Sequence, residues 1–183
     1  MDRRQRKSRE AIFSAFIALL SRKDYNQITV GEIIAGADVG RATFYAHFET
    51  KDYLLKALCE DLFCHILDDA QQKECDHRHM FTCNGTDSVF LHLFQHLQKD
   101  DNHILTLLSS RNNDLFWHYF KTNLYHLAES QLPLFAHRKN ENLPHSFWVD
   151  HIAATFVETV RWWISNGMQE SPEIITAYFL AAV

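Results

Sequence analysis

The chain has 183 residues, of which 46% are hydrophobic and 22% charged, a composition that is typical of a folded protein and excludes an intrinsically disordered one. Its formal net charge is −5, yet residues 1–56 hold ten Lys and Arg against seven Asp and Glu, so the basic excess is entirely N-terminal. Only five Gly and three Pro interrupt the chain and no alternating Val, Ile and Thr-rich run occurs, so the sequence predicts an all-α protein.

The first predicted helix covers about residues 3–22. Its apolar residues have amphipathic spacing: Ile12, Phe13, Phe16, Ile17 and Leu20. The basic start is a poor secretory signal, because Ser14 interrupts the apolar run and Arg22 and Lys23 follow without a cleavage site. No other apolar stretch approaches the roughly 18 residues of a membrane span. We therefore expect a cytoplasmic protein that does not associate with a membrane.

Two short helices around a tight turn are predicted between Thr29 and Lys51. The first begins with a capping box, since Glu32 follows Thr29 three residues later. In the second, Phe44 and Phe48 lie one helical turn apart and should face inward. The opposite face is small and polar: Arg41, Ala42, Thr43, Tyr45 and Ala46. Such a face fits the major groove of double-stranded DNA, because small residues allow close approach, hydroxyls reach phosphates and Arg can bind guanine.

A long helix with a cap at Thr50 is predicted from Lys51 to about Ala70, and it should connect this head to the rest of the chain. Residues 71–87 are polar and predict a loop. Further helices are predicted at about residues 88–98, 102–109, 113–132, 146–166 and 172–183. We expect a DNA-binding domain at residues 1–50 and a helical regulatory and dimerisation domain at residues 51–183.

The predicted helix at residues 146–166 is apolar on more than one side. One stripe can face its own domain, and the other could pair with the same helix of a second subunit. The predicted dimer interface consists of Val149, Ile152, Phe156, Val160 and Trp163. The alternative is that neighbouring helices of one subunit cover both stripes.

Metal binding is the main competing chemistry, since the chain has twelve His and four Cys. Four potential ligands occur in the predicted loop: Cys75, His77, His79 and Cys83. Their spacing matches no standard structural zinc motif. His92 and His96 lie one helical turn apart, but without an H-E-x-x-H motif we interpret them as surface residues of a helix. No catalytic motif is recognisable either, so we predict no enzyme, no metal and no cofactor.

Residues 8–70 resemble the DNA-binding region of the TetR family of bacterial transcriptional regulators. The resemblance rests on Thr29, the I-x-x-x-A-x-V turn at residues 33–39, the T-F-Y-x-H-F segment at residues 43–48, and Lys51. It implies phosphate contacts from Thr29, Thr43, Tyr45, His47 and Lys51, and base contacts from Arg41 and Ala42. Gly40 departs from the commoner Ser and leaves the second helix without a side-chain cap.

The resemblance also implies that helices beyond the linking helix enclose a pocket for a small apolar or aromatic effector. Candidate lining residues are Phe94, Phe116, Trp117 and Phe120. The predicted function is that of a homodimeric regulator that represses transcription from a palindromic operator and is released by its effector. The alternatives are a metal-binding helical sensor and a protein-interaction module.

Overall fold

The computed structural model describes residues 3–71, 88–99, 103–109, 114–138 and 142–183, and the predicted all-α fold is confirmed. The head consists of α1 (Arg3–Leu20), a 3-10 turn η1 (Tyr25–Gln27), α2 (Val30–Ala37) and α3 (Arg41–His47). The body consists of α4 (Lys51–Gln71), α5 (Val89–Lys99), α6 (Ile104–Ser109), α7 (Asp114–Ser130), η3 (Leu132–Phe135), α8 (His145–Ser165) and α9 (Pro172–Ala182). In the described part of the chain, no helix is both long and apolar enough to span a bilayer.

The head is held together by the apolar face of α1, which packs against α2 and α3. Close approach of α1 and α2 depends on Gly36, because a Cβ atom at this position would lie 3.2 Å from the Cβ atom of Ala15. A larger side chain would push the two helices apart. The small residues therefore fix how α2, and with it the turn to α3, sits on the first helix.

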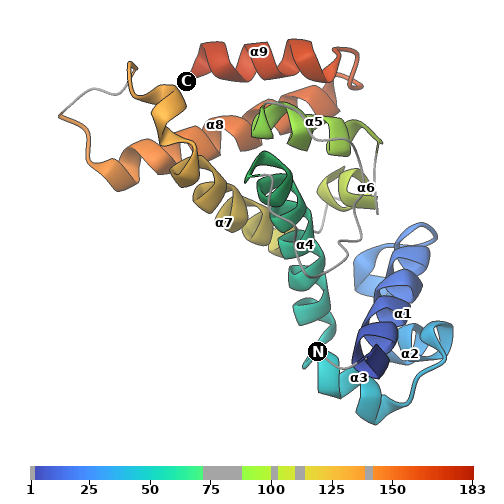
Figure 1. Cartoon of the computed structure of the whole chain (residues 1–183). Helices are drawn as coiled ribbons and strands as arrows, with labels where there is room; N and C mark the ends of the chain where they lie inside the picture. Colours follow the sequence, from blue (N-terminus) through green and yellow to red (C-terminus); the bar gives the residue numbers. More distant parts are fainter. Residues whose placement is uncertain (1–2, 72–87, 100–102, 110–113, 139–141) are drawn as a thin grey trace.

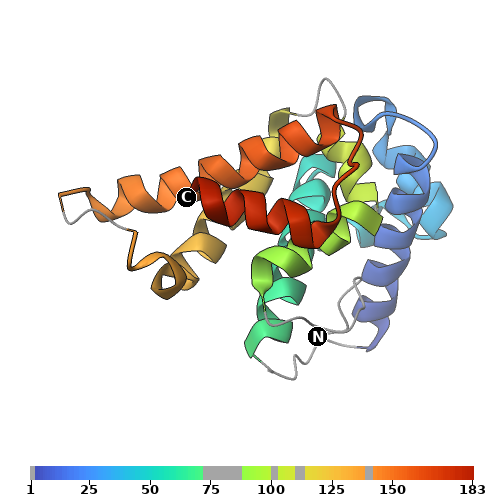
Figure 2. The same ribbon diagram turned by 90° about the horizontal axis from the view of Figure 1, so that it is seen from above.

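Helix α4 links the head to the body (Figure 1). Its first turn lies beside the head, and its remaining length packs against α5 and α7. Helix α7 in turn packs on α8, while α9 packs on both α5 and α8. Seen from above, α8 and α9 lie side by side along one flank of the body (Figure 2). The predicted start of α9 is confirmed, since the Ser171 hydroxyl accepts the Ile174 N–H at 3.4 Å with Pro172 at the first helical position.

Aromatic rings fill the centre of the body. Phe94 of α5 stacks on Phe156 of α8 with ring centroids 4.5 Å apart, and it meets Trp163 edge-to-face at 5.6 Å. Of the predicted effector-lining residues, Phe94, Phe116 and Phe120 are fully buried. These three rings are therefore part of the packed core of the body.

The predicted dimer interface is wrong. Its residues are all 0% exposed within a single chain: Val149, Ile152, Phe156, Val160 and Trp163. Helices α5, α7 and α9 cover this stripe of α8, so none of these side chains is available to a second subunit. The alternative, in which helices of the same chain cover both stripes, is correct for this stripe.

Candidate nucleic-acid interface

Helix α3 presents one apolar and one polar face, as the sequence predicted. Phe44 and Phe48 face into the head and are 0% and 2% exposed. Arg41 and Ala42 are exposed at the start of the helix, and Tyr45 is 53% exposed one turn further on. The inward phenyl rings therefore fix the rotation of α3 and leave its outer face open to solvent.

The turn between α2 and α3 places the first residues of α3 at the surface. Asp38 ends α2 in the left-handed conformation, with φ at 51°, which Asp tolerates better than most residues. Its N–H donates to the Ala35 carbonyl at 3.4 Å, and the Val39 N–H donates to the Ile34 carbonyl at 3.2 Å. Gly40 is the N-cap of α3 and supplies no side-chain cap, in agreement with the sequence. Gly40 therefore leaves the first N–H groups of α3 without a hydrogen bond from an N-cap side chain.

His47, at the end of α3, is positioned by α1. Its Nε2 atom lies 2.6 Å from the Ser8 hydroxyl oxygen. Burial, and then the nearby positive charge of Arg9, lower the pKa of His47 below its ordinary value. The neutral form of the ring is therefore favoured, and its Nε2 atom forms a hydrogen bond with Ser8. Ser8 could not be found from sequence, because it precedes His47 by 39 residues.

A shallow groove separates α1 from α3 on the same surface. Its lining residues are Arg4, Gln5, Ser8, Arg9, Ala42, Thr43, Ala46 and His47. The Arg9 guanidinium lies over the Phe13 ring, 4.6 Å from its centroid, which holds this cation beside α3. The N-terminal basic residues and the outer face of α3 thus form one surface with a positive edge.

Thr29 is exposed at the start of α2, but its side chain is already engaged. The Thr29 hydroxyl donates to the Glu32 carboxylate at 2.8 Å and accepts the Glu32 N–H at 3.3 Å, so the predicted capping box is present. Glu32 also pairs with Lys23. Hydrogen bonds from Lys23 and then from Thr29 lower the pKa of Glu32 to about 2. The carboxylate beside Thr29 is therefore ionised, and it disfavours a phosphate at this position.

Lys51, which was predicted to contact phosphate, has its ammonium group engaged within the chain. Its Nζ atom donates to the backbone carbonyls of Tyr25, at 3.1 Å, and Ile28, at 2.9 Å. The ammonium also lies 4.3 Å from the centroid of the Tyr25 ring. In the next position of α4, Asp52 accepts a hydrogen bond from the Tyr25 hydroxyl. Lys51 and Asp52 therefore join α4 to the head.

Trp117, one of the four predicted effector residues, lies in a surface groove between α7 and α8. Arg161 lies over its indole ring at 4.7 Å. The groove also contains Asp114, Lys121 and Asp150. These charged side chains do not match the apolar pocket that the sequence predicted.

An exposed apolar face runs along α8 and α9. Trp162 is 45% exposed, Tyr178 is 51% exposed, and their ring centroids are 6.2 Å apart. Around them is a shallow hollow whose lining includes Ala154, Ile175 and Ala182. This face is on the opposite side of α8 from the buried stripe. None of the predicted interface residues belongs to it.

The interpretation of His92 and His96 as surface residues is also wrong. They are 1% and 2% exposed, and they lie beside His65 of α4, which is 4% exposed. The four potential ligands in the predicted loop, for which no metal role was predicted, lie outside the described residues: Cys75, His77, His79 and Cys83.

Two family models match the chain. The model described as bacterial regulatory proteins of the tetR family matches residues 12–58, which contain most of the head and the start of α4. A second model, described as a transcriptional regulator C-terminal region, matches residues 84–182.

Comparison with solved structures and curated proteins agrees with these matches. A TetR transcriptional regulator from Streptococcus agalactiae 2603V is 32% identical, with coverage of 100% of this chain and 96% of that chain and a TM-score of 0.74. The transcriptional regulator FadR from Bacillus subtilis, solved in complex with stearoyl-CoA, has the same fold, with 19% identity, coverage of 94% and 95%, and a TM-score of 0.58. The uncharacterized HTH-type transcriptional regulator YxbF of Bacillus subtilis (strain 168) is 22% identical over 191 residues, or 98% of this chain and 45% of that protein. The chain thus spans about half the length, or less, of the curated relatives it matches.

Proposed function

Since the chain belongs to the TetR family of bacterial transcriptional regulators, we propose that it binds a palindromic operator as a homodimer and represses transcription until an effector releases it. The observation that carries this proposal is the outer face of α3, where Arg41, Ala42 and Tyr45 are exposed on a helix that two buried phenyl rings hold in place. A protein acting on chromosomal DNA in a bacterium works in the cytoplasm.

The proposed contacts divide into two kinds. Arg41 faces base edges and binds a guanine in the major groove, and Ala42 beside it permits close approach. Thr43 and Tyr45 donate their hydroxyls to phosphates, and His47 contributes from the end of the helix. Arginines of α1 supply the local positive charge that displaces counterions from DNA. In this proposal Thr29 and Lys51 support the head instead of touching phosphates, because both side chains are engaged within the chain.

Dimerisation is proposed through the exposed face of α8 and α9. This face carries Trp162, Tyr178 and Ile174, each about half exposed in the single chain. Two copies related by a two-fold axis would bury these side chains against each other. The two heads would then reach half-sites centred about one helical turn of DNA, roughly 34 Å, or a multiple of it apart.

Selection of binding sites from random DNA tests the proposal directly. The full chain should enrich a palindromic sequence, and its affinity for that sequence should fall steeply with salt. An Arg41→Ala variant serves as the matched protein that has the same fold but lacks the proposed base contact. Enrichment of no sequence, or of a site without two-fold symmetry, would contradict a dimeric regulator.

Repression is tested with a reporter gene placed behind the selected site. If the protein blocks access of polymerase, expression of the reporter should fall when the protein is produced. A rise in expression would instead identify an activator.

A further inference from the structure

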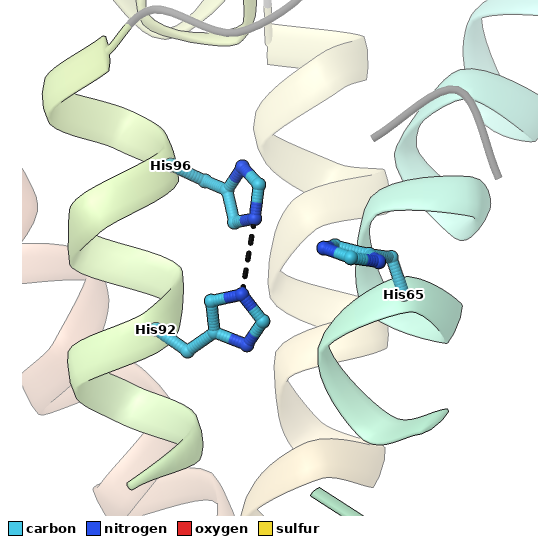
Figure 3. A group of neighbouring side chains, drawn as sticks. All are labelled: His65, His92 and His96. Carbon is cyan, nitrogen blue, oxygen red and sulfur yellow. Dashed lines mark hydrogen bonds between the residues drawn. The ribbon is translucent and has the colours of Figure 1, made fainter. Parts of the chain in front are cut away.

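Three buried histidines meet where the linking helix packs against the body. His65 of α4, His92 of α5 and His96 of α5 each offer one ring nitrogen, and these three atoms lie within 4.8 Å of one another. Figure 3 shows the His65 ring turned toward the pair on the facing helix. All three side chains are at least 96% buried, so the cluster is enclosed by the fold.

The geometry of the cluster suits a metal ion. The Nε2 atoms of His92 and His96 are 3.2 Å apart. Two nitrogens bound to one tetrahedral zinc ion at 2.0 to 2.1 Å are separated by about 3.3 Å, which is nearly the same distance. His65 is somewhat further away, and its ring would close on the pair by on the order of 1 Å to complete the set.

We propose that His65, His92 and His96 bind one late first-row divalent metal ion, with Zn²⁺ as the natural ligand, and that occupancy of this site is the effector signal that α4 passes to the head. Imidazole nitrogen favours zinc and its neighbours in the transition series, whereas magnesium and calcium require oxygen ligands. Three protein ligands leave a fourth position that water can fill. The effector role rests on the proposed function, whereas metal binding by the three histidines does not.

Metal binding requires a change of tautomer in the His92 and His96 pair. In the metal-free protein, one ring of the His92 and His96 pair donates its Nε2 proton to the Nε2 atom of the other. When the metal enters, that proton moves to Nδ1 of the same ring by exchange with water. Both Nε2 lone pairs are then directed at the metal.

Helix α4 connects the site to the DNA-binding head. His65 follows Lys51 by fourteen residues on α4, which corresponds to about 21 Å of helix. Lys51 and Asp52 fasten the first turn of α4 to the carbonyls and ring hydroxyl of the head. A metal ion that draws His65 toward α5 therefore moves or locks α4, the helix that links the head to the body.

Metal binding is tested first on the unaltered protein. After treatment with a chelator, the full chain is titrated with Co²⁺ as a spectroscopic probe and then with Zn²⁺ as competitor. We expect one equivalent of Co²⁺ with the visible absorption of a four- or five-coordinate site, its displacement by Zn²⁺, and a melting temperature that rises with Zn²⁺ concentration. Failure of the wild-type chain to bind one equivalent overturns the proposal, and this result does not depend on whether any variant folds.

Single substitutions then locate the site. His65→Gln, His92→Gln and His96→Gln should each weaken binding at least about 10-fold, because loss of even an outer-shell partner costs that much. The matched control is His137→Gln, since His137 is exposed and distant in sequence from the cluster. Circular dichroism of each metal-free variant shows whether it is folded. Equal binding by the control and the three cluster variants would place the metal elsewhere and refute the site.

The regulatory half is tested with the DNA sequence obtained by selection. Zn²⁺ should change the affinity of the wild-type protein for this sequence at least about 5-fold, and His65→Gln should abolish the change. Metal bound at the cluster without any change in DNA affinity would refute the effector role. If selection enriches no DNA sequence, the proposed function fails, while the Co²⁺ titration still decides the metal site.

Discussion

Replacing Lys51 with Met distinguishes support of the fold by this residue from a contact with phosphate, because the two roles lead to opposite results. The substitution keeps most of the side-chain stem but removes the ammonium that donates to the Tyr25 and Ile28 carbonyls. A hydrogen bond from a charged group contributes about 1.5 to 3 kcal/mol, and a cation over an aromatic ring at a partly exposed site adds about 0.5 to 1 kcal/mol. Because Lys51 is only partly buried, water replaces some of this interaction. We therefore expect a loss of about 2 to 4 kcal/mol in the free energy of unfolding.

This loss is measured by thermal and urea denaturation of Lys51→Met beside the wild type. For a chain of this length, about 1 kcal/mol shifts the melting temperature by about 2 to 4 °C, so the expected decrease is about 5 to 15 °C. The matched control is Lys56→Met on the same helix. Lys56 pairs with Glu60 at 3.5 Å with both side chains more than 40% exposed, so its loss should cost less than about 0.5 kcal/mol.

The predicted phosphate contact gives the opposite pattern. If Lys51 bound phosphate and did not support the fold, the melting temperature of Lys51→Met would be unchanged, and the salt dependence of DNA binding would decrease by about one counterion. That result would refute the structural role argued here.

Three other substitutions test the head, the dimer face and the capping box. Arg41→Ala should cost about 1 to 3 kcal/mol of DNA binding and relax the preference at one base pair in the selection experiment; an equal loss on every sequence would contradict base readout. Trp162→Glu should yield a monomer in analytical ultracentrifugation, whereas Tyr53→Glu, 49% exposed on α4 and outside the proposed interface, should leave the dimer intact. Glu32 has a pKa lowered from 4.5 to about 2 in the folded state, so the unfolded chain takes up the proton first as the pH falls. The stability advantage of the wild type over Glu32→Gln should therefore be complete above about pH 4.5 and disappear toward about pH 2, and an advantage in urea denaturation that persists at pH 2 would contradict this assignment.

The features predicted correctly from sequence are those that depend on neighbouring residues. The Thr29 and Glu32 capping box, the inward phase of Phe44 and the start of α9 at Ser171 each follow from residues within one or two helical turns. Such patterns fix the local conformation and the rotation of a helix about its axis. They do not state what a polar side chain touches once the helices pack.

The contacts that sequence patterns did not reveal join distant segments of the chain. Lys51 donates to carbonyls that precede it by 26 and 23 residues, and no pattern in the sequence connects these positions. The two apolar stripes of α8 pose the same difficulty. The stripe with Phe156 and Trp163 is inside because rings from α5 meet it, and this pairing is visible only in three dimensions.

The histidine cluster shows how local and distant information combine. The spacing of His92 and His96 places both rings on one face of α5, and the sequence indicated that much. Whether that face is solvated or buried depends on α4, which brings His65 against it from 27 positions earlier in the chain. The same helix carries Lys51 at its other end. An element that is anchored in the head by its first turn and in the body by a buried cluster cannot shift at one end without a response at the other, because an α-helix is rigid over this length. We therefore propose that the position of α4 is the variable through which a ligand in the body acts on α3.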